Sequence, residues 1–421
     1  MRRLLSILTV MALVVTISPA AFATNGTALI GIGPIARSMG GVGVAAPQDA
    51  ISAVFANPAA MCFGPYCPAS EFNFAGTLFM PSPEAKVRFG EATFKGSSDS
   101  KVYPIPAIGI STPLTEGPKP LRFGLSAYGV SGLGVDYRGT ALDQPNPLDP
   151  SVPLTAGVFT ELQQMVFGAA VAWQPAANFS IGMAPRILYS NADFENGSNS
   201  AFALGIQAGV LWMPIDNLSL GLNYVYNGSS TFDNVLRNPF TGYREDLDLQ
   251  NPQELAFGVA YTFFDKLLVE LDAKWINWSS ADGFEDFDWD DQWVIGIGAQ
   301  FEVVPKLFLR AGYNYGENPV NEHNGWSPAP PSVDPTNVVV VQGIPFPTPA
   351  YEQFRIVGFP AIVEHHVTAG VGYEFSDRFS GNLGLVHAFR NDITEVSAGN
   401  AIELKSELYE WSLDFGLTWR F

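Results

Sequence analysis

The chain has 421 residues, with 22 lysines and arginines against 41 aspartates and glutamates, a formal net charge of −19. Only 15% of the residues are charged, whereas 47% are hydrophobic, 13% are aromatic and 41 are glycines. The acidic excess excludes a nucleic-acid-binding protein, because phosphates require a basic surface. The many apolar residues exclude a disordered chain. Few charges combined with many aromatic residues and glycines indicate a β-rich membrane protein.

The first 23 residues have the pattern of a secretory signal peptide. Met1-Arg2-Arg3 is a basic start, residues 4–22 form an apolar stretch, and Ala21-Phe22-Ala23 supplies the small residues of a cleavage site. A membrane-anchoring helix is the alternative, because the stretch approaches the roughly 20 residues that a spanning helix needs. Pro19 favours the cleaved signal peptide, so we predict an exported protein. No later apolar stretch is long enough for a spanning helix, so any attachment to a membrane must use strands.

From residue 69 to the C-terminus, apolar and polar residues alternate. The last segment is the clearest: positions 409–421 carry aromatic or aliphatic residues at every odd number and polar or small residues between them. A tilted crossing of an outer membrane needs about 9–11 residues, and bacterial single-chain barrels have an even number of strands. Fourteen such segments are predicted, at residues 72–80, 105–112, 121–132, 165–173, 179–189, 202–212, 218–226, 254–263, 267–278, 293–301, 307–315, 366–375, 379–389 and 409–421.

The links between these segments are alternately short and long in the second half of the chain. Short links with turn-forming residues lie at 174–178, 214–217, 264–266, 303–306 and 376–378, and long polar links lie at 227–253, 279–292, 316–365 and 390–407. A soluble sandwich has no reason for this alternation, whereas a barrel has short periplasmic turns and long extracellular loops. We therefore predict an all-β membrane protein, a 14-stranded antiparallel outer-membrane β-barrel formed by residues 69–421.

Residues 24–68 contain no alternating stretch long enough to cross a membrane. They are rich in glycine and small residues and carry one short apolar run at 51–55, so we predict an N-terminal hatch, or plug, inside the barrel. Cys62 and Cys67 are the only cysteines, five positions apart in an oxidising compartment, which predicts a disulfide at the end of this plug. A metal-binding pair is the alternative, although no histidine lies nearby in the sequence.

Several motifs occur in an order that resembles a known family. They are a glycine-rich stretch followed by Asn57-Pro58-Ala59, then Gly132-Leu133 with Asp136-Tyr137, Thr160-Glu161-Leu162, the stretch 310–315 with Asn318-Pro319-Val320, and a terminal Phe421. In this order the chain resembles the FadL/TodX family of outer-membrane transporters for long-chain fatty acids and other hydrophobic compounds, including aromatic hydrocarbons. The resemblance covers nearly the whole mature chain.

The resemblance implies passive uptake of a hydrophobic small molecule. Outer loops capture the ligand, an apolar lumenal pocket receives it, and it leaves sideways through a gap where the third strand is kinked against the hatch. The implied hatch and substrate-path residues are Leu29, Ile30, Asn57, Pro58 and Ala59. The implied residues of the lateral kink are Gly129, Ser131, Gly132, Leu133 and Gly134.

Physical chemistry agrees with such a route. Each CH₂ removed from water gains about 0.8 kcal/mol, so a water-filled porin would repel a ligand that an apolar pocket accepts. Glycines open a strand ladder at little cost. The simpler alternatives are that these glycines merely end a strand, and that Asn57-Pro58 is only a turn.

The chain departs from the family in its loops. The link between the fifth and sixth strands is short, whereas the link between the eleventh and twelfth is long and carries Val339, Val341, Ile344 and Phe346. We predict that this insertion forms the outer capture loop; the alternative is a proline-rich loop without fixed structure. Phe421 is predicted to be the signal for the barrel-assembly machinery.

The chemical class of the ligand stays open at this point. Long-chain fatty acids are expected from the family, but no lysine or arginine occurs between Arg186 and Arg237, and a carboxylate would need a cation near its pocket. Uncharged hydrocarbons or aromatic compounds are therefore the alternative, and a general porin is a third possibility. The other predicted partners are outer-membrane lipid and lipopolysaccharide, and the protein is predicted to be a monomer.

No sequence motif indicates an enzyme, a cofactor or a metal centre. The sequence has neither a His-x-Ser nor a Gly-x-Ser-x-Gly nucleophile motif. Glu364-His365-His366 lies where a loop enters a strand, which favours a structural role over a metal site. The acidic loop 282–291 lacks the central glycine and closing glutamate of an EF-hand loop, so we interpret it as a solvated outer loop with weak divalent binding to lipopolysaccharide as the alternative.

Overall fold

The computed structural model describes residues 24–62, 70–99, 102–115, 117, 119–145, 155–194 and 197–421. The predicted signal peptide and Cys67 lie outside these residues, so both the cleavage and the disulfide stay predictions. Among the described residues, no helix is long and apolar enough to cross a membrane.

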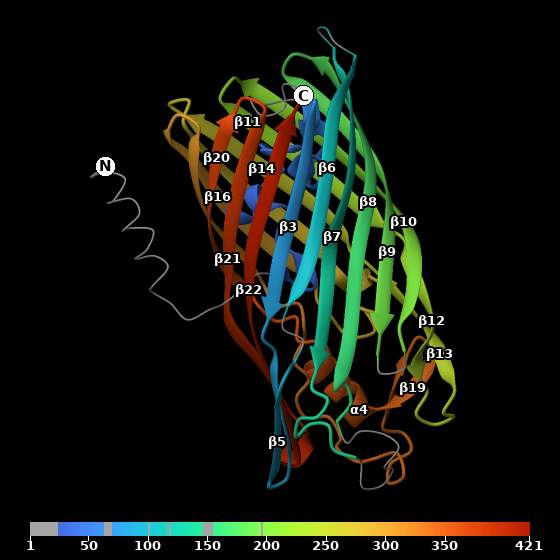
Figure 1. Ribbon diagram of the computed structural model, residues 1–421. Coiled ribbons are helices and arrows are strands. Elements are labelled where there is room, and N and C mark those ends of the chain that lie inside the picture. Colours follow the sequence, from blue (N-terminus) through green and yellow to red (C-terminus); the bar gives the residue numbers. More distant parts are fainter. Residues whose placement is uncertain are drawn as a thin grey trace, which may run out of the picture.

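The structure is a closed, antiparallel β-barrel of fourteen strands (Figure 1). The first barrel strand pairs with the last, from Arg420 opposite Glu71 to Glu410 opposite Pro81, which closes the wall. The predicted fold class is confirmed, and each of the fourteen predicted segments overlaps one strand. The strands are β3 (Glu71–Pro81), β6 (Tyr103–Thr115), β7 (Leu121–Asp136), β8 (Phe159–Ala176), β9 (Phe179–Asp193), β10 (Asn199–Ile215), β11 (Leu218–Asn227), β14 (Gln253–Phe263), β15 (Leu267–Asn277), β16 (Gln292–Val304), β17 (Leu307–Gly316), β20 (His365–Ser376), β21 (Phe379–Val396) and β22 (Ile402–Arg420).

Alternation along each strand separates an apolar outer face from a polar inner face. On β22, Leu413 and Trp419 are 44% and 52% exposed, whereas Asp414 between them is 0% exposed. Lipid cannot satisfy backbone N–H and C=O groups, so a spanning sheet has to close on itself and present apolar side chains outward. The pattern along the sequence is therefore the direct cause of the barrel.

The two ends of the barrel differ. The C-terminus and the short turns lie at one end, which we call the short-turn rim, and the long loops lie at the other, the long-loop rim (Figure 1). The long loops contain three hairpins and several short helices, namely β4 (Glu84–Phe89) with β5 (Ala92–Ser97), β12 (Ser229–Arg237) with β13 (Arg244–Gln250), β18 (Val338–Val341) with β19 (Ile344–Pro347), η2 (Trp278–Ser280), α4 (Thr348–Gln353), η3 (Phe354–Gly358) and η4 (Ala398–Asn400).

The β4–β5 hairpin extends the wall beyond the barrel. β4 pairs with the first part of β22, from Ile402 opposite Phe89 to Glu407 opposite Glu84. This hairpin is not among the predicted strands, because each of its strands has only 6 residues, fewer than a membrane crossing needs.

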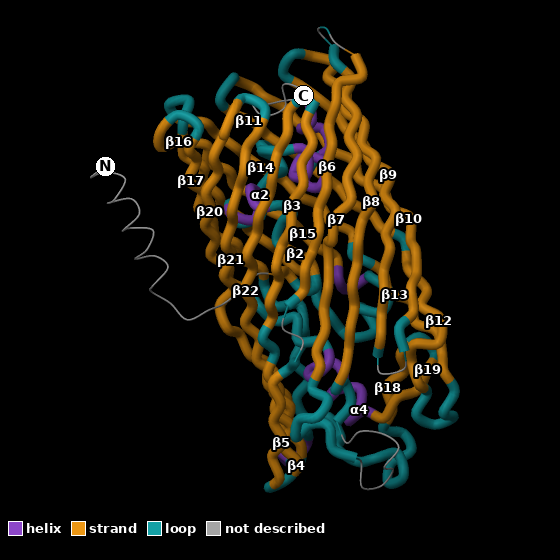
Figure 2. Tube along the Cα trace, viewed as in Figure 1, coloured by secondary structure: helices purple, strands orange, loops and turns teal. Residues whose placement is uncertain are grey.

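Residues 24–62, which we call the N-terminal segment, lie inside the barrel (Figure 2). The segment consists of β1 (Thr24–Asn25), β2 (Ala28–Leu29), α2 (Pro34–Ser38), α3 (Ala50–Ala56) and η1 (Pro58–Cys62). Helix α3 begins at a good capping residue, since the Asp49 side chain accepts a hydrogen bond of 2.8 Å from the backbone N–H of Ser52. Met39 and Val42 pack against Ala260 and Leu268 of the wall, so the segment fills part of the lumen.

Glycines in the wall allow the segment to lie directly against the strands. A Cβ at Gly312 of β17 would lie 2.2 Å from the backbone nitrogen of Gly40, and a Cβ at Gly221 of β11 would lie 2.1 Å from the carbonyl oxygen of Val44. No side chain fits at such distances, so the backbone of the segment occupies the space that these glycines leave.

Gly312→Ala should therefore push the N-terminal segment off the wall without unfolding the barrel. We expect faster amide hydrogen exchange in residues 35–45, measured by mass spectrometry on the purified barrel, because the new methyl group meets backbone atoms that cannot turn away. Gly381→Ala is the matched control: its Cβ would first meet the Phe375 ring, at 3.0 Å, a side chain that can rotate. Equal exchange in both variants would contradict the close packing.

Candidate functional site

The ladder of the barrel wall is interrupted between β6 and β7. Pairing between them runs from Thr115 opposite Leu121 to Ala107 opposite Tyr128 and stops there. Beyond that point β6 continues beside β3 as far as Tyr103, and β7 continues beside β8 as far as Asp136. The β7–β8 register shifts between Gly129 and Ser131, which marks a bulge. The two strands therefore part towards the long-loop rim.

Sequence features explain why the ladder opens at this point. Pro104 and Pro106 lie on the part of β6 that no longer pairs with β7, and proline has no N–H to donate to a ladder. Opposite them, β7 carries Gly129, Gly132 and Gly134, which accommodate a bulge at low cost.

The N-terminal segment supplies partners for β7 at the interruption. Ala28 of β2 pairs with Ser131. The backbone N–H of Gly132 donates to the Thr27 carbonyl oxygen over 3.1 Å, and the Ser131 hydroxyl lies 3.0 Å from the same oxygen and 2.8 Å from the Thr27 hydroxyl. The opening in the wall is thus bridged from inside by the segment.

A cavity of about 310 Å³ lies at this interruption. Its lining includes Leu29 of the N-terminal segment, Ile105 of β6, and Leu162 and Met165 of β8. The described residues that line it include no lysine or arginine, and Glu410 is their one carboxylate. Both Glu410 oxygens lie about 3 Å from the Thr24 hydroxyl, at 3.1 and 3.0 Å. We call this space the lateral cavity.

The residues predicted to form the lateral kink all line this cavity: Gly129, Ser131, Gly132, Leu133 and Gly134. A steric constraint explains why position 129 is a glycine. A Cβ at this position would lie 2.3 Å from Cγ2 of Ile105, so only a glycine leaves room for the isoleucine to lie across the gap.

The predicted substrate-path residues lie in three different places. Leu29 lines the lateral cavity. Asn57, Pro58 and Ala59 lie instead against β9 and β10, where the Asn57 side-chain amide donates to the carbonyl oxygens of Val44 and Val210 over 2.8 and 3.1 Å. A Cβ at Gly209 of β10 would lie 2.0 Å from the Asn57 side-chain oxygen. This motif therefore fastens the end of the segment to the wall, away from the lateral cavity.

Ile30 lines a second, smaller lumenal cavity of about 40 Å³. Arg186 of β9 and Lys274 of β15 also line it, and the Lys274 ammonium lies 3.0 Å from Glu254. Arg186 is 5% exposed, and its Nε atom has no hydrogen-bond partner among the described residues.

A buried ion pair anchors helix α2. Arg37 Nε lies 2.9 Å from Asp414 of β22, one of its terminal nitrogens donates to the Ser412 hydroxyl over 2.7 Å, and both charged side chains are 0% exposed. Neither residue is among the predicted site residues, because they are 377 positions apart and each alone looks ordinary.

Two carboxylates on the inner face of β15 hold the middle of the segment. The backbone N–H groups of Gly43 and Val44 donate to Asp272 over 2.8 and 3.1 Å. Those of Ala45 and Ala46 donate to Glu270 over 2.7 and 2.9 Å. The sequence carried a signal for this site: charged residues at alternate positions in a spanning strand point into the lumen, where they require partners.

The predicted outer capture residues lie in the β18–β19 hairpin at the long-loop rim. Val341 and Ile344 are buried, at 2% and 7% exposure, and Val339 and Phe346 are half-buried against the same hydrophobic cluster of loop residues. The proline-rich insertion is thus a folded loop, and these four side chains pack within it.

The remaining candidates take structural positions. Phe421 lies at the short-turn rim, where its N–H donates to the Ser70 carbonyl oxygen over 2.9 Å. In the acidic loop, Asp291 accepts hydrogen bonds from Trp275, Asn277 and Ser279. His365 contacts the Tyr313 hydroxyl at 2.6 Å. Cys62 ends η1.

Comparison with known proteins agrees with this geometry. Residues 196–334 match the model of a family described as outer membrane protein transport protein (OMPP1/FadL/TodX). The fold is FadL-like. No curated protein matches the chain.

Solved structures match over nearly the whole FadL-like barrel. The P. putida toluene transporter TodX has 17% sequence identity and a TM-score of 0.66, with 93% of this chain and 99% of that chain covered. A Pseudomonas aeruginosa FadL homologue has 13% identity and a TM-score of 0.65, covering 96% and 100%. The Ralstonia pickettii toluene transporter TbuX has 15% identity and a TM-score of 0.61, covering 93% and 98%. At these identities the likeness concerns the fold.

Arg37→Met should destabilise the attachment of the N-terminal segment. The substitution leaves Asp414 buried without its partner, which typically costs about 3–5 kcal/mol. We expect faster hydrogen exchange across residues 24–45 while the barrel keeps its strand content by circular dichroism.

The double variant Arg37→Met/Asp414→Leu is the control, because replacing both charges with apolar groups is often nearly neutral. It should recover most of the lost protection. Exchange as fast as in the single variant would show that the ion pair is not the anchor.

Proposed function

We propose that this protein takes up hydrophobic small molecules passively across the outer membrane, through the lateral cavity and the interruption between β6 and β7. The observation that carries the proposal is an apolar cavity located where the wall ladder is broken. In this proposal the N-terminal segment is the hatch that bridges the opening.

The energetics favour such a path over a wet channel. A ligand gains about 0.8 kcal/mol for each CH₂ that leaves water, and an apolar cavity preserves this gain. A size of about 310 Å³ falls at the lower end of the roughly 300–1,000 Å³ that small-molecule sites occupy. The N-terminal segment fills part of the lumen, which argues against a general porin.

The lining favours an uncharged ligand over a fatty acid. A carboxylate needs a cationic partner when it leaves water. The described lining of the lateral cavity offers none, and Glu410 would add repulsion. Two of the structurally similar proteins are named as toluene transporters. We therefore place hydrocarbons or monoaromatic compounds ahead of the long-chain fatty acids that the family resemblance first suggests.

Long-chain fatty acids are the second candidate, because the smaller lumenal cavity contains Arg186 and Lys274 beside the carboxylates of Glu254 and Asp272. Arg186 has an Nε atom without a partner among the described residues, and a carboxylate could accept a hydrogen bond from it. Capture of the ligand by the β18–β19 hairpin, contact with lipopolysaccharide, recognition by the barrel-assembly machinery through Phe421 and a monomeric state remain predictions.

A disulfide across the opening tests the route. A Cβ at position 129 would lie 3.7 Å from Cβ of Ile105, and disulfides join Cβ atoms about 3.8 Å apart. In a Cys62→Ser/Cys67→Ser background, oxidised Ile105→Cys/Gly129→Cys should lose at least about tenfold in toluene uptake, the rate factor of roughly 1.4 kcal/mol. Reduction should restore the uptake.

The control is a second cross-link in an intact part of the wall. Ala299 and Ala311 lie opposite each other in the β16–β17 ladder, so an oxidised Ala299→Cys/Ala311→Cys variant should transport normally. Unchanged uptake by the oxidised 105–129 variant would refute a lateral exit at this place. Uptake of oleate and of toluene, measured side by side in proteoliposomes that contain the wild-type protein, distinguishes the two ligand classes.

A further inference from the structure

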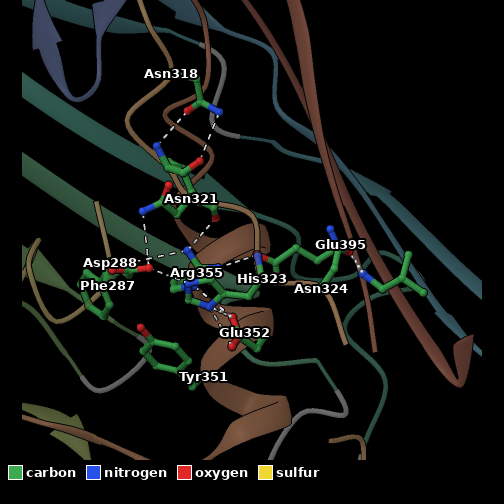
Figure 3. Close-up of polar contacts among 12 residues, drawn as sticks. Phe287, Asp288, Asn318, Asn321, His323, Asn324, Tyr351, Glu352, Arg355 and Glu395 are labelled. Carbon is green, nitrogen blue, oxygen red and sulfur yellow. Dashed lines mark hydrogen bonds and ion pairs between the residues drawn. The ribbon is translucent and has the colours of Figure 1, made fainter. Parts of the chain in front are cut away.

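Charged side chains at the long-loop rim join segments that are far apart in the sequence (Figure 3). His323 and Arg355 belong to the loop between β17 and β20, residues 317–364, and Glu352 belongs to α4 in the same loop. Asp288 belongs to the loop between β15 and β16, residues 278–291, and Glu395 to the end of β21. We call the loop 317–364 the long loop.

Both ring nitrogens of His323 face carboxylates. Nδ1 lies 3.1 Å from both oxygens of Glu352, and Nε2 lies 2.7 Å from Asp288. An ionised carboxylate only accepts hydrogen bonds, so both nitrogens have to donate at once, which only the protonated, positively charged imidazolium does. The backbone N–H of His323 also donates to Glu395 over 2.8 Å.

We propose that His323 is a protonation-controlled latch, which fastens the long loop to the loop 278–291 at low pH and loosens it as the pH rises. The charged groups that face this histidine are Asp288, Glu352, Arg355 and Glu395. Only the consequence for ligand entry depends on the proposed transport function.

The charge balance gives the direction of the switch. Arg355 is completely buried, lies 3.0 Å from Glu352 and forms a second ion pair with Glu395. When His323 is charged, it and Arg355 face the carboxyl groups of Asp288, Glu352 and Glu395; when His323 is neutral, Arg355 is the one cation left among these groups. Repulsion among carboxylates in a half-buried site then weakens the junction.

The stability of the junction changes with pH in one direction only. The hydrogen bond to Glu352, supported by the one to Asp288, raises the pKa of His323 above its ordinary 6.5. The stability that this proton adds is therefore complete below pH 6.5 and is lost as the pH rises through the higher folded-state pKa. Burial raises the pKa of Glu395 to about 7. Its deprotonation in the same range also adds negative charge, so it acts in the same direction.

The two loops that the latch joins also share a cluster of phenylalanine rings. The ring centroids of Phe354 and Phe359, both in the long loop, lie 5.8 and 5.5 Å from the ring centroid of Phe194. The same two rings lie 5.7 and 5.4 Å from the ring centroid of Phe287. Pro360, next in the chain, lines the lateral cavity. Loosening the junction between the long loop and Phe287's loop would therefore open this aromatic cluster towards the cavity.

A divalent cation bound among these side chains explains the geometry less well than a proton on His323 does. Candidate ligand atoms of His323, Glu352 and Glu395 lie within 4.8 Å of one another, but a zinc ion would need an unprotonated ring nitrogen of His323. Arg355 already forms ion pairs with both glutamates, and both imidazole nitrogens face carboxylates. Zinc serves below as a probe of this alternative.

Hydrogen exchange on the purified, full-length barrel in detergent tests the latch. Rates in residues 348–363 and 281–289, corrected for intrinsic exchange, are measured from about pH 5.5 to about pH 9, the range in which a histidine with a raised pKa titrates. We expect protection to fall roughly two- to fivefold as the pH rises, the size of effect that partly exposed ion pairs have. His323→Gln should show the low protection already at the acid end.

His365→Gln is the matched control, because His365 lies at the same rim but contacts Tyr313, and it should keep the wild-type profile. Constant protection in the wild type, or a wild-type profile in His323→Gln, would overturn the latch. Full restoration of protection at high pH by equimolar Zn²⁺ would also overturn it in favour of a metal site. None of these readouts uses transport, so failure of the proposed transport function gives a separate result.

Discussion

The backbone hydrogen bonds of the wall are the constraint on which the rest of this structure depends. In lipid, an unpaired N–H or C=O group has no water to bind, so every strand must pair on both sides and the sheet must close. Fourteen strands satisfy this condition nearly everywhere, and β22 completes it by pairing with β3. Between β6 and β7 the ladder stops at Tyr128, and there β7 takes partners from the N-terminal segment instead.

This exchange of partners links the wall to the lumen. Because Thr27 and Ala28 complete β7, the position of the segment decides whether the opening is bridged. That position is set by contacts on three sides: the Arg37–Asp414 ion pair on β22, the carboxylates of Glu270 and Asp272 on β15, and the Asn57 amide on β10. Polar residues on the inner face thus hold the segment, while the cavity beside it is mostly apolar.

Much of the fold follows from the sequence, since alternation over a span of membrane thickness has few physical solutions. The sequence could also indicate where the wall opens, because the glycines of β7 cluster in one strand. The sequence could not indicate the role of Ile105, because its side chain lies across the gap only where Gly129 leaves room for it. Arg37 and Asp414, or His323 and Asp288, meet through the closed barrel or through loop packing, so no local pattern pairs them. The β4–β5 hairpin is missed for another reason: it extends the wall outside the membrane, where strand length is not constrained.

The lateral cavity is the feature on which the functional account depends most directly. Crystals of the protein soaked with a brominated monoaromatic compound would locate the ligand by the anomalous signal of bromine. We predict a peak among Leu29, Ile105, Leu133 and Met165, beside the interruption between β6 and β7. A peak confined to the smaller cavity near Arg186 and Lys274, or no peak inside the barrel, would contradict the account.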